Sequence, residues 1–412
     1  MMNFDRGVIK NTFMLYMMNI AKMIFPLITL PYLTRVLTVE CFGVVAFVKV
    51  IMQYMQIIVD FGFNLSGTKD IVLVKNDNEK LGIEVGNILI AKLLLSVVAL
   101  IVLCILTLAF DILSDYKALT FLSFIVVFLT NFLFDYFFRG IERMEFITMR
   151  FVLMRGIAAF ATFFVVRDDS DIIWIPILDI LGSIVAIFLV LRVMNKLNIK
   201  IGFSSICDIL CKIKLSAIYF FSLVASISLM GVNTLFVGFY MNTTDIAYWS
   251  ICLQFITAVQ AFYTPLTDAI YPHMVKKKDI NILKRFLSLY LPFVILGCVI
   301  TWLFADYFLL IMGGDQYTSA AEVLKYLTPV MFFSFPAMLF GWPALGAIGK
   351  EKSITNSTIV TILIQVIGLL FLVWFNKITL LNLAILRGLV ECVLLVLRFR
   401  YCFKFRNEFS FI

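Results

Sequence analysis

Apolar segments of about 20 residues, long enough to cross the hydrocarbon core of a bilayer as helices, recur from one end of this chain to the other. Of its 412 residues 62% are hydrophobic, and the mean hydropathy is +1.03. The pattern predicts an all-α polytopic membrane protein with twelve transmembrane helices. The predicted spans cover approximately residues 10–35, 42–65, 85–109, 118–138, 147–166, 172–193, 213–240, 246–271, 286–305, 321–348, 354–375 and 379–400.

A polar connection at about residues 194–212 divides the predicted spans into two groups of six. We therefore expect an N-terminal lobe over residues 1–200 and a C-terminal lobe over residues 201–412. A weak internal repeat with an offset of 204 positions, in which Gln56 corresponds to Gln260, agrees with this division.

Basic residues are distributed unevenly between the two sides of the predicted membrane. Of the 34 Lys and Arg residues, 24 lie on the side that carries both termini and four lie on the opposite side. By the positive-inside rule, this distribution predicts that both termini are cytoplasmic. Membrane topology thereby explains the net charge of +8, and no nucleic-acid partner is predicted.

One of the apolar segments carries a polar stripe. Lys49, Gln53, Gln56 and Asp60 fall within roughly 60° of one another when the segment is helical. A charged side chain that faces lipid costs about 2.5–3.5 kcal/mol even on the gentler scales, so this face is predicted to line a watery cavity or a transport path. The predicted eighth span has a second polar face, which includes Gln254.

Ionisable residues inside the predicted spans have more than one interpretation. They are Lys22, Lys49, Asp60, Lys92, Arg155, Asp179, Arg387 and Glu391. Lys22 and Lys49 have no acidic residue three or four positions away, which favours a position in a cavity. Lys92, near the cytoplasmic end of its span, is interpreted as a side chain that extends to the membrane surface.

The other intramembrane charges could form structural pairs. Arg387 and Glu391 lie four residues apart on one span and could neutralise each other. Arg155 and Asp179 lie on adjacent predicted spans and could pair in the same way. Both pairs therefore remain open between a structural role and a role in the cavity.

A cavity lined by Lys and Arg favours anions, and phosphate above all, because several cationic groups can share its oxygens. Amide and hydroxyl side chains on the same faces can hydrogen-bond sugars. The predicted substrate-binding residues are Lys22, Lys49, Gln53, Gln56, Arg155, Gln254 and Arg387. A carboxylate in a low-dielectric site can take up a proton or Na⁺. The candidates for such ion coupling are Asp60, Asp179, Asp268 and Glu391.

Metal-dependent or His-based catalysis has little support in the sequence. His273 is the only histidine, no CxxC pair occurs, and cysteines such as Cys104 and Cys252 lie within apolar runs. We therefore expect no catalytic residue, no metal site and no cofactor other than H⁺ or Na⁺ as a coupling ion.

Several short motifs resemble those of one transporter family. They are residues 26–37 (PLITLPYLTRVL), Phe42-Gly43, residues 60–69 (DFGFNLSGTK), residues 138–144 (FRGIERM) and residues 270–272 (IYP). The chain resembles, over essentially its whole length, the Wzx-type O-antigen flippases of the multidrug/oligosaccharidyl-lipid/polysaccharide exporter superfamily. Arg139 departs from the uncharged polar residue expected in many relatives, so no substrate role is assigned to it.

The resemblance implies two six-helix lobes around a central cavity lined mainly by spans one, two, seven and eight. It implies a cargo, an undecaprenyl-diphosphate-linked oligosaccharide, that moves from the cytoplasmic to the periplasmic leaflet of a bacterial inner membrane. The lobes would alternate between inward-open and outward-open states while the polyprenyl tail stays among the membrane lipids. The resemblance leaves open an association with other polysaccharide assembly proteins.

Three alternative functions agree less well with the sequence. A drug exporter of the same superfamily usually carries cations, which a Lys-lined cavity would repel. A peptidoglycan-precursor flippase usually has about fourteen spans rather than twelve. A polysaccharide polymerase or lipid-linked glycosyltransferase generally has a long periplasmic loop, whereas the longest outward loop here, near residues 306–320, has about fifteen residues. The chain is therefore predicted not to be an enzyme.

Overall fold

The computed structural model describes residues 6–410, except for the side chains of residues 6–9, 12, 222, 225, 226, 229 and 230. The described part of the chain is helical throughout and contains no β-strand, only an isolated bridge between Asp279 and Ser410. The prediction of an all-α protein is confirmed.

Eleven helical segments of the described chain are long and apolar enough to cross a membrane. They are Phe13–Val36, Val39–Val74, Asn78–Ala109, Lys117–Gly140, Met144–Val165, Asp169–Lys196, Thr243–Lys277, Ile280–Leu303, Asp315–Gly346, Glu351–Trp374 and Leu380–Lys404. Each coincides with one of the predicted spans. The predicted seventh span lies in the 35-residue helix α10 (Ile206–Tyr240), which includes residues outside the described side chains, and it stays a prediction.

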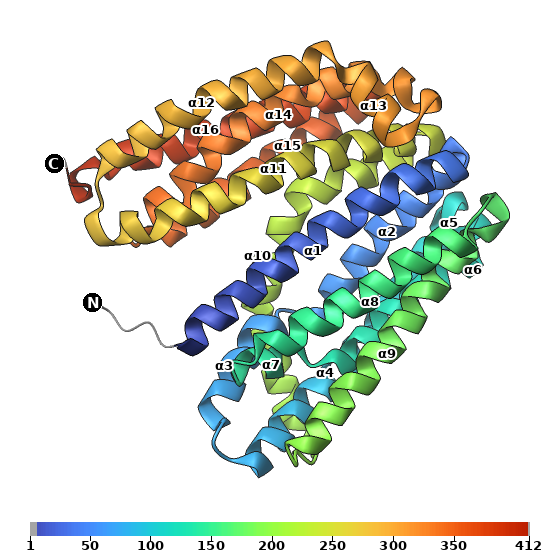
Figure 1. The fold of residues 1–412 in the computed structure, drawn as a ribbon, viewed down its shortest axis with the longest axis vertical. Coiled ribbons are helices and arrows are strands. Elements are labelled where there is room, and N and C mark those ends of the chain that lie inside the picture. The colour runs from blue at the N-terminus through green and yellow to red at the C-terminus, as the bar shows by residue number, and fades with distance from the viewer. Residues whose placement is uncertain (1–5, 411–412) are drawn as a thin grey trace. The chain divides into compact units, whose positions relative to one another are not determined.

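The chain forms two compact units, Met1–Val224 and Ala225–Ile412, which meet in sequence within α10. The assignment of residues 1–200 and 201–412 to two transport lobes stays a prediction. The first unit contains α1 (Arg6–Val36), α2 (Val39–Asp60), α3 (Phe63–Val74), α4 (Asn78–Ala109), α5 (Asp111–Asp115), α6 (Lys117–Leu129), η1 (Thr130–Leu133), α7 (Asp135–Gly140), α8 (Met144–Val165), η2 (Asp169–Ile173) and α9 (Trp174–Lys196). Within it α1 lies beside α8, and α8 lies beside α9 (Figure 1).

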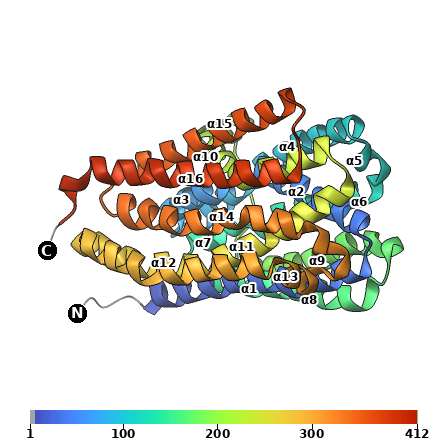
Figure 2. The ribbon, with the colours of Figure 1, turned by 90° about the horizontal axis from the view of Figure 1, so that it is seen from above.

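The second unit is built around a central helix, α14. Its elements are α11 (Thr243–Lys277), α12 (Ile280–Leu303), α13 (Ala305–Gly313), η3 (Asp315–Ala320), α14 (Ala321–Leu339), η4 (Phe340–Gly346), α15 (Glu351–Trp374), α16 (Leu380–Lys404) and η5 (Arg406–Glu408). Figure 2 shows α14 between α12 and α16, and it also packs against α11. Arg398 of α16 donates a 2.7 Å hydrogen bond to the carbonyl oxygen of Ala337, beside the irregular turn at Gly341.

The predicted second span is interrupted near its C-terminal end. Thr38 caps the start of α2 by accepting a hydrogen bond from the Cys41 amide. The helix ends at Asp60 because Phe61 and Gly62 adopt left-handed backbone conformations, with φ of 40° and 83°. At Gly62 only glycine fits, since a Cβ atom there would lie 2.5 Å from Cβ of Tyr219 in α10.

The predicted fourth span is interrupted in a similar way. After α6 the chain makes the 3₁₀ turn η1, and Phe134, with φ of 49°, separates this turn from α7. The aromatic side chains that follow are almost completely buried in the core, and the Tyr136 hydroxyl donates to the Val85 carbonyl oxygen at 3.1 Å. Thr68 of α3 donates to the Tyr136 carbonyl oxygen at 3.3 Å, so the two interrupted spans are bonded to each other.

Candidate functional site

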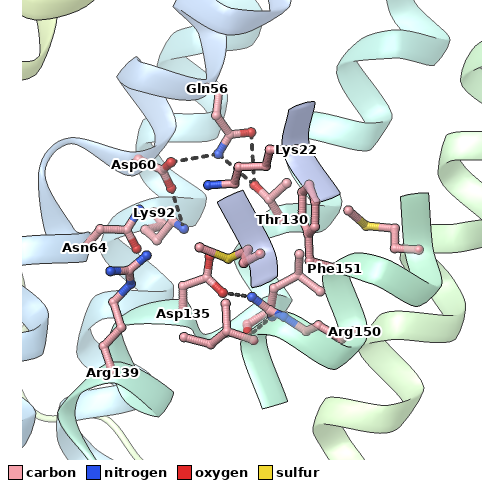
Figure 3. Close-up of a pocket in the computed structure, with 14 residues that line it drawn as sticks. Lys22, Gln56, Asp60, Asn64, Lys92, Thr130, Asp135, Arg139, Arg150 and Phe151 are labelled. Atoms are coloured by element: carbon pink, nitrogen blue, oxygen red, sulfur yellow. Dashed lines mark hydrogen bonds and ion pairs between the residues drawn. The ribbon is translucent and has the colours of Figure 1, made fainter. Parts of the chain in front are cut away.

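A polar cavity of about 230 Å³ lies within the first unit (Figure 3). Its lining comes from α1, α2, α3, α4, η1, α7 and α8. The lining residues are Met18, Lys22, Gln56, Asp60, Asn64, Lys92, Thr130, Leu133, Asp135, Arg139, Ile147, Arg150, Phe151 and Met154. Four bases and two acids face this space, so the lining carries a formal charge of +2.

The two interrupted spans bring most of the polar groups to this cavity. Asp60 is the last residue of α2, and Asn64 lies in the first turn of α3. Thr130 begins η1, and Asp135 begins α7 directly after the left-handed Phe134. Irregular backbone at membrane depth is tolerated where it lines a cavity, and these breaks fit that rule.

Asp60 is held by a base and an amide. The Lys92 Nζ atom lies 2.9 Å from Asp60 Oδ1, and Gln56 Nε2 donates to Asp60 Oδ2 at 3.0 Å. Gln56 and Thr130 are also hydrogen-bonded to each other, which ties α2 to η1. Lys92 is only 4% exposed, so the interpretation that it extends to the membrane surface is wrong. The Asp60 carboxylate on α2 pairs with the Lys92 ammonium directly, so Lys92 does not need to extend to the headgroup region.

A second acid–base pair closes the other side of the cavity. Arg150 of α8 is buried, forms an ion pair with Asp135, and donates to the carbonyl oxygen of Leu133. One guanidinium thus binds both the backbone of η1 and the first residue of α7. The positive-inside distribution counts Arg150 among the 24 bases predicted on the cytoplasmic side, and it indicates neither of these two partners.

Two bases at the cavity have no acidic partner among the described residues. Lys22 Nζ lies 5.7 Å from the ring centroid of Phe151, and no carboxylate lies within ion-pair distance of it. Arg139 Nε is buried and has no hydrogen-bond partner in the described structure. Figure 3 shows the Arg139 guanidinium beside Asn64. Because the other charges cancel in pairs, the net charge of +2 resides on Lys22 and Arg139.

Arg139 was assigned no role from the sequence, and the structure places it in the cavity. The residue follows an unbroken aromatic run and precedes Gly140, a pattern typical of a span end. The break at Phe134 separates α7, the short helix that carries Arg139, from the preceding helical turn η1. Nothing in the local sequence predicts that break. Of the predicted substrate-binding residues, Lys22 and Gln56 line the cavity, as does the predicted coupling residue Asp60.

Other predicted residues form a second charged cluster in the first unit. Arg155 of α8 donates to both carboxylate oxygens of Asp179 on α9, at 2.9 and 3.0 Å, so the two residues form the pair that was one of the two alternatives. Lys49 of α2 is exposed and interacts electrostatically with both of these residues. Gln53 is exposed on α2. The cluster of Lys49, Arg155 and Asp179 lies outside the cavity lining and keeps one excess positive charge.

The remaining predicted residues lie in the second unit. Arg387 and Glu391 are both buried and form a 2.7 Å ion pair along α16, which agrees with the alternative in which they neutralise each other. Gln254 is half-buried on α11, and Asp268 is exposed on the same helix. Their roles in binding or coupling stay predictions. Among the described residues no group of three or more His, Cys, Asp or Glu side chains is placed to hold a metal ion.

Comparison with known proteins supports a transporter. Residues 8–278 match the model of a family described as polysaccharide biosynthesis protein. A Shigella dysenteriae protein whose name is that of an O-antigen transporter is 25% identical over 377 residues, which cover 89% of this chain and 93% of that protein. These matches confirm the resemblance drawn from the motifs and favour a transporter over an enzyme.

Solved structures agree on the fold. The lipid II flippase MurJ in an inward closed conformation superposes with a TM-score of 0.74 at 14% identity, covering 98% of this chain and 88% of that one. An inward-facing multidrug resistance MATE transporter gives a TM-score of 0.67 at 14% identity, covering 94% and 98%. The predicted MATE-like membrane fold is confirmed.

Proposed function

The chain belongs to the polysaccharide biosynthesis protein family, and from this premise we propose that it is a flippase for lipid-linked oligosaccharides. The cargo is a repeat unit of O-antigen or another surface polysaccharide on undecaprenyl diphosphate. It is moved from the cytoplasmic to the periplasmic leaflet of a bacterial inner membrane. The single observation that carries this proposal is the presence of two unneutralised bases, Lys22 and Arg139, in an otherwise charge-paired cavity.

The charge of the cavity matches the charge of the linkage. A diphosphate esterified at both ends carries two negative charges, and Lys22 and Arg139 offer two positive ones. The buried Arg139 Nε atom is a donor without an acceptor, and a phosphate oxygen would satisfy it. A cationic drug, by contrast, would be repelled by the same lining, so the drug-exporter alternative is disfavoured.

Uncharged polar groups beside these bases suit the sugar portion. Gln56, Asn64 and Thr130 present amide and hydroxyl groups to the cavity, and such groups pair with sugar hydroxyls. Phe151 offers an aromatic ring on which a sugar face can stack. The first sugar would therefore lie next to the diphosphate, while the longer oligosaccharide extends beyond the cavity.

Coupling to an ion gradient would involve Asp60. Its carboxylate is engaged by Lys92 and Gln56, so it can bind H⁺ or Na⁺ only when Lys92 is drawn elsewhere. A phosphate in the cavity competes for Lys92 and would release Asp60 for the ion. Alternating access then follows from motion of the two lobes, with both termini in the cytoplasm as the distribution of bases predicts.

The test is flipping of a fluorescent polyprenyl-diphosphate disaccharide in proteoliposomes. Replacing Lys22 or Arg139 with Gln should reduce the apparent affinity about 10- to 100-fold for each residue, because each loses a hydrogen bond to a charged group. Lys69→Gln, which removes an exposed base of α3 outside the cavity, serves as the matched control. Unchanged flipping in both cavity variants would contradict the proposed function.

A further inference from the structure

A second cavity, here termed the lateral pocket, lies between α7, α8 and α9 in the first unit and has a volume of about 290 Å³. Its lining residues are Phe138, Phe146, Met149, Arg150, Leu189, Val190, Arg192, Val193 and Lys196. Three of the nine are bases, six are apolar, and none is acidic. The lateral pocket therefore combines a strongly positive rim with an apolar wall.

Two of the three bases are free to bind a ligand. Arg150 is engaged by Asp135 and the Leu133 carbonyl oxygen. Arg192 and Lys196 lie four residues apart on α9, which places them on the same face of the helix. Both are exposed, and neither forms an ion pair or hydrogen bond with any residue that the structure describes.

The apolar wall continues into the surface that faces lipid. Phe138 and Val190 are almost completely buried and form the inner side of the pocket. Met149 is 48% exposed at its rim. On α9, Phe188 is exposed one turn from Arg192, and exposed apolar side chains of this kind are suited to pack against acyl chains. A ligand with a hydrocarbon tail can therefore place its head in the pocket without leaving the bilayer.

The lateral pocket differs from the polar cavity in one respect that identifies its occupant. The polar cavity presents Gln56, Asn64 and Thr130, whereas the described lining residues of the lateral pocket include no uncharged polar side chain. It can pair with phosphate oxygens and pack against acyl chains, but it has no group suited to hydrogen-bond a sugar.

We propose that the lateral pocket binds the phosphate headgroup of an anionic glycerophospholipid, with Arg192 and Lys196 as its ligands. Basic pockets between transmembrane helices are suited to such headgroups. This inference does not depend on the proposed flippase activity. Because Arg150 lines both cavities, a bound headgroup competes with Asp135 for Arg150 and so connects lipid occupancy to the polar cavity.

Native mass spectrometry of the purified full-length chain tests the proposal. The probes are phosphatidylglycerol, phosphatidylcholine with the same acyl chains, and undecaprenyl diphosphate, each titrated separately. The double variant Arg192→Gln/Lys196→Gln removes both ligands. Lys276→Gln/Lys277→Gln removes two exposed bases at the end of α11 and is the matched control for charge. Val193→Trp fills the pocket without changing its charge.

We expect phosphatidylglycerol to bind the wild-type chain and the control more tightly than phosphatidylcholine does. The Arg192→Gln/Lys196→Gln variant should weaken phosphatidylglycerol binding roughly thirtyfold, and Val193→Trp should weaken it as well. If the Lys276→Gln/Lys277→Gln control loses affinity for phosphatidylglycerol to the same extent, the effect comes from general surface charge, and the proposed site is wrong. A loss of undecaprenyl diphosphate binding that exceeds the loss for phosphatidylglycerol would assign the pocket to the polyprenyl lipid instead and overturn the proposed occupant.

Discussion

Asp60, the last residue of α2, forms a 2.9 Å ion pair with Lys92 of α4 at the point where the second span is interrupted. Lys92 has a 5% exposed side chain and Asp60 a 21% exposed one, so each charge depends on the other for stabilisation. The ion pair therefore has two roles. It stabilises the break in the helix, and it keeps a carboxylate available beside the cavity.

Replacing Lys92 with Met should destabilise the first unit by about 3–5 kcal/mol, because Asp60 then loses its buried partner. Thermal unfolding of the purified protein in detergent would show a lower midpoint. The double variant Lys92→Met/Asp60→Asn, which removes both charges, should recover much of that loss. Equal midpoints for the single variant and the wild-type chain would show that the pair contributes no stability.

Asp60→Asn should lower the midpoint of thermal unfolding, because the buried Lys92 loses its acid, and in the protein that folds it should remove the dependence of transport on an ion gradient, because an amide cannot take up a proton and binds Na⁺ weakly. Flipping would be measured in proteoliposomes with and without an imposed proton or Na⁺ gradient. Should the gradient dependence persist in this variant, the coupling role would pass to Asp179, Asp268 or Glu391.

Lys49→Ala tests the second charged cluster against the polar cavity. The cluster keeps one excess positive charge beside the Arg155–Asp179 pair, and we expect its loss to abolish surface polysaccharide while folded protein remains in the membrane. Polysaccharide would be examined by gel electrophoresis of cell extracts, with membrane protein quantified in parallel. Normal polysaccharide from this variant, together with loss in Lys22→Ala, would restrict substrate binding to the polar cavity.

Gly62→Ala should be strongly destabilising for a reason that hydropathy does not capture. The left-handed conformation costs about 1–2 kcal/mol for a residue with a side chain, and the new Cβ atom would also clash with Tyr219. Gly297→Ala in α12 is the matched control, since a Cβ atom there would meet no other atom within 4 Å. Midpoints of thermal unfolding for the two variants should differ by several degrees, and similar midpoints would contradict the strain at Gly62.

Hydropathy predicted the positions of the eleven spans that the structure tests, because backbone groups in hydrocarbon must be paired within helices and about 20 apolar residues are needed to cross the bilayer. The breaks inside two of these spans were not predictable. Gly62 is compatible with a helix end, but Phe61 and Phe134 are bulky residues with positive φ, a conformation that their side chains disfavour. α3 packs against α7, and Tyr219 of α10 lies close to Gly62, and these contacts between separate helices are visible only in three dimensions.

The sequence by itself determined that the chain spans a membrane and that Lys22, Gln56 and Asp60 require polar surroundings, because an isolated charge in lipid is too costly to keep. Only the tertiary structure decided which partner each charge has. Lys92 pairs with Asp60 across 32 positions, Arg150 pairs with Asp135 of the preceding short helix, and Arg139 lines the cavity without an acidic partner among the residues that the structure describes. Ion pairing depends on distances of a few ångströms between separate helices, and no local pattern in the chain encodes those distances.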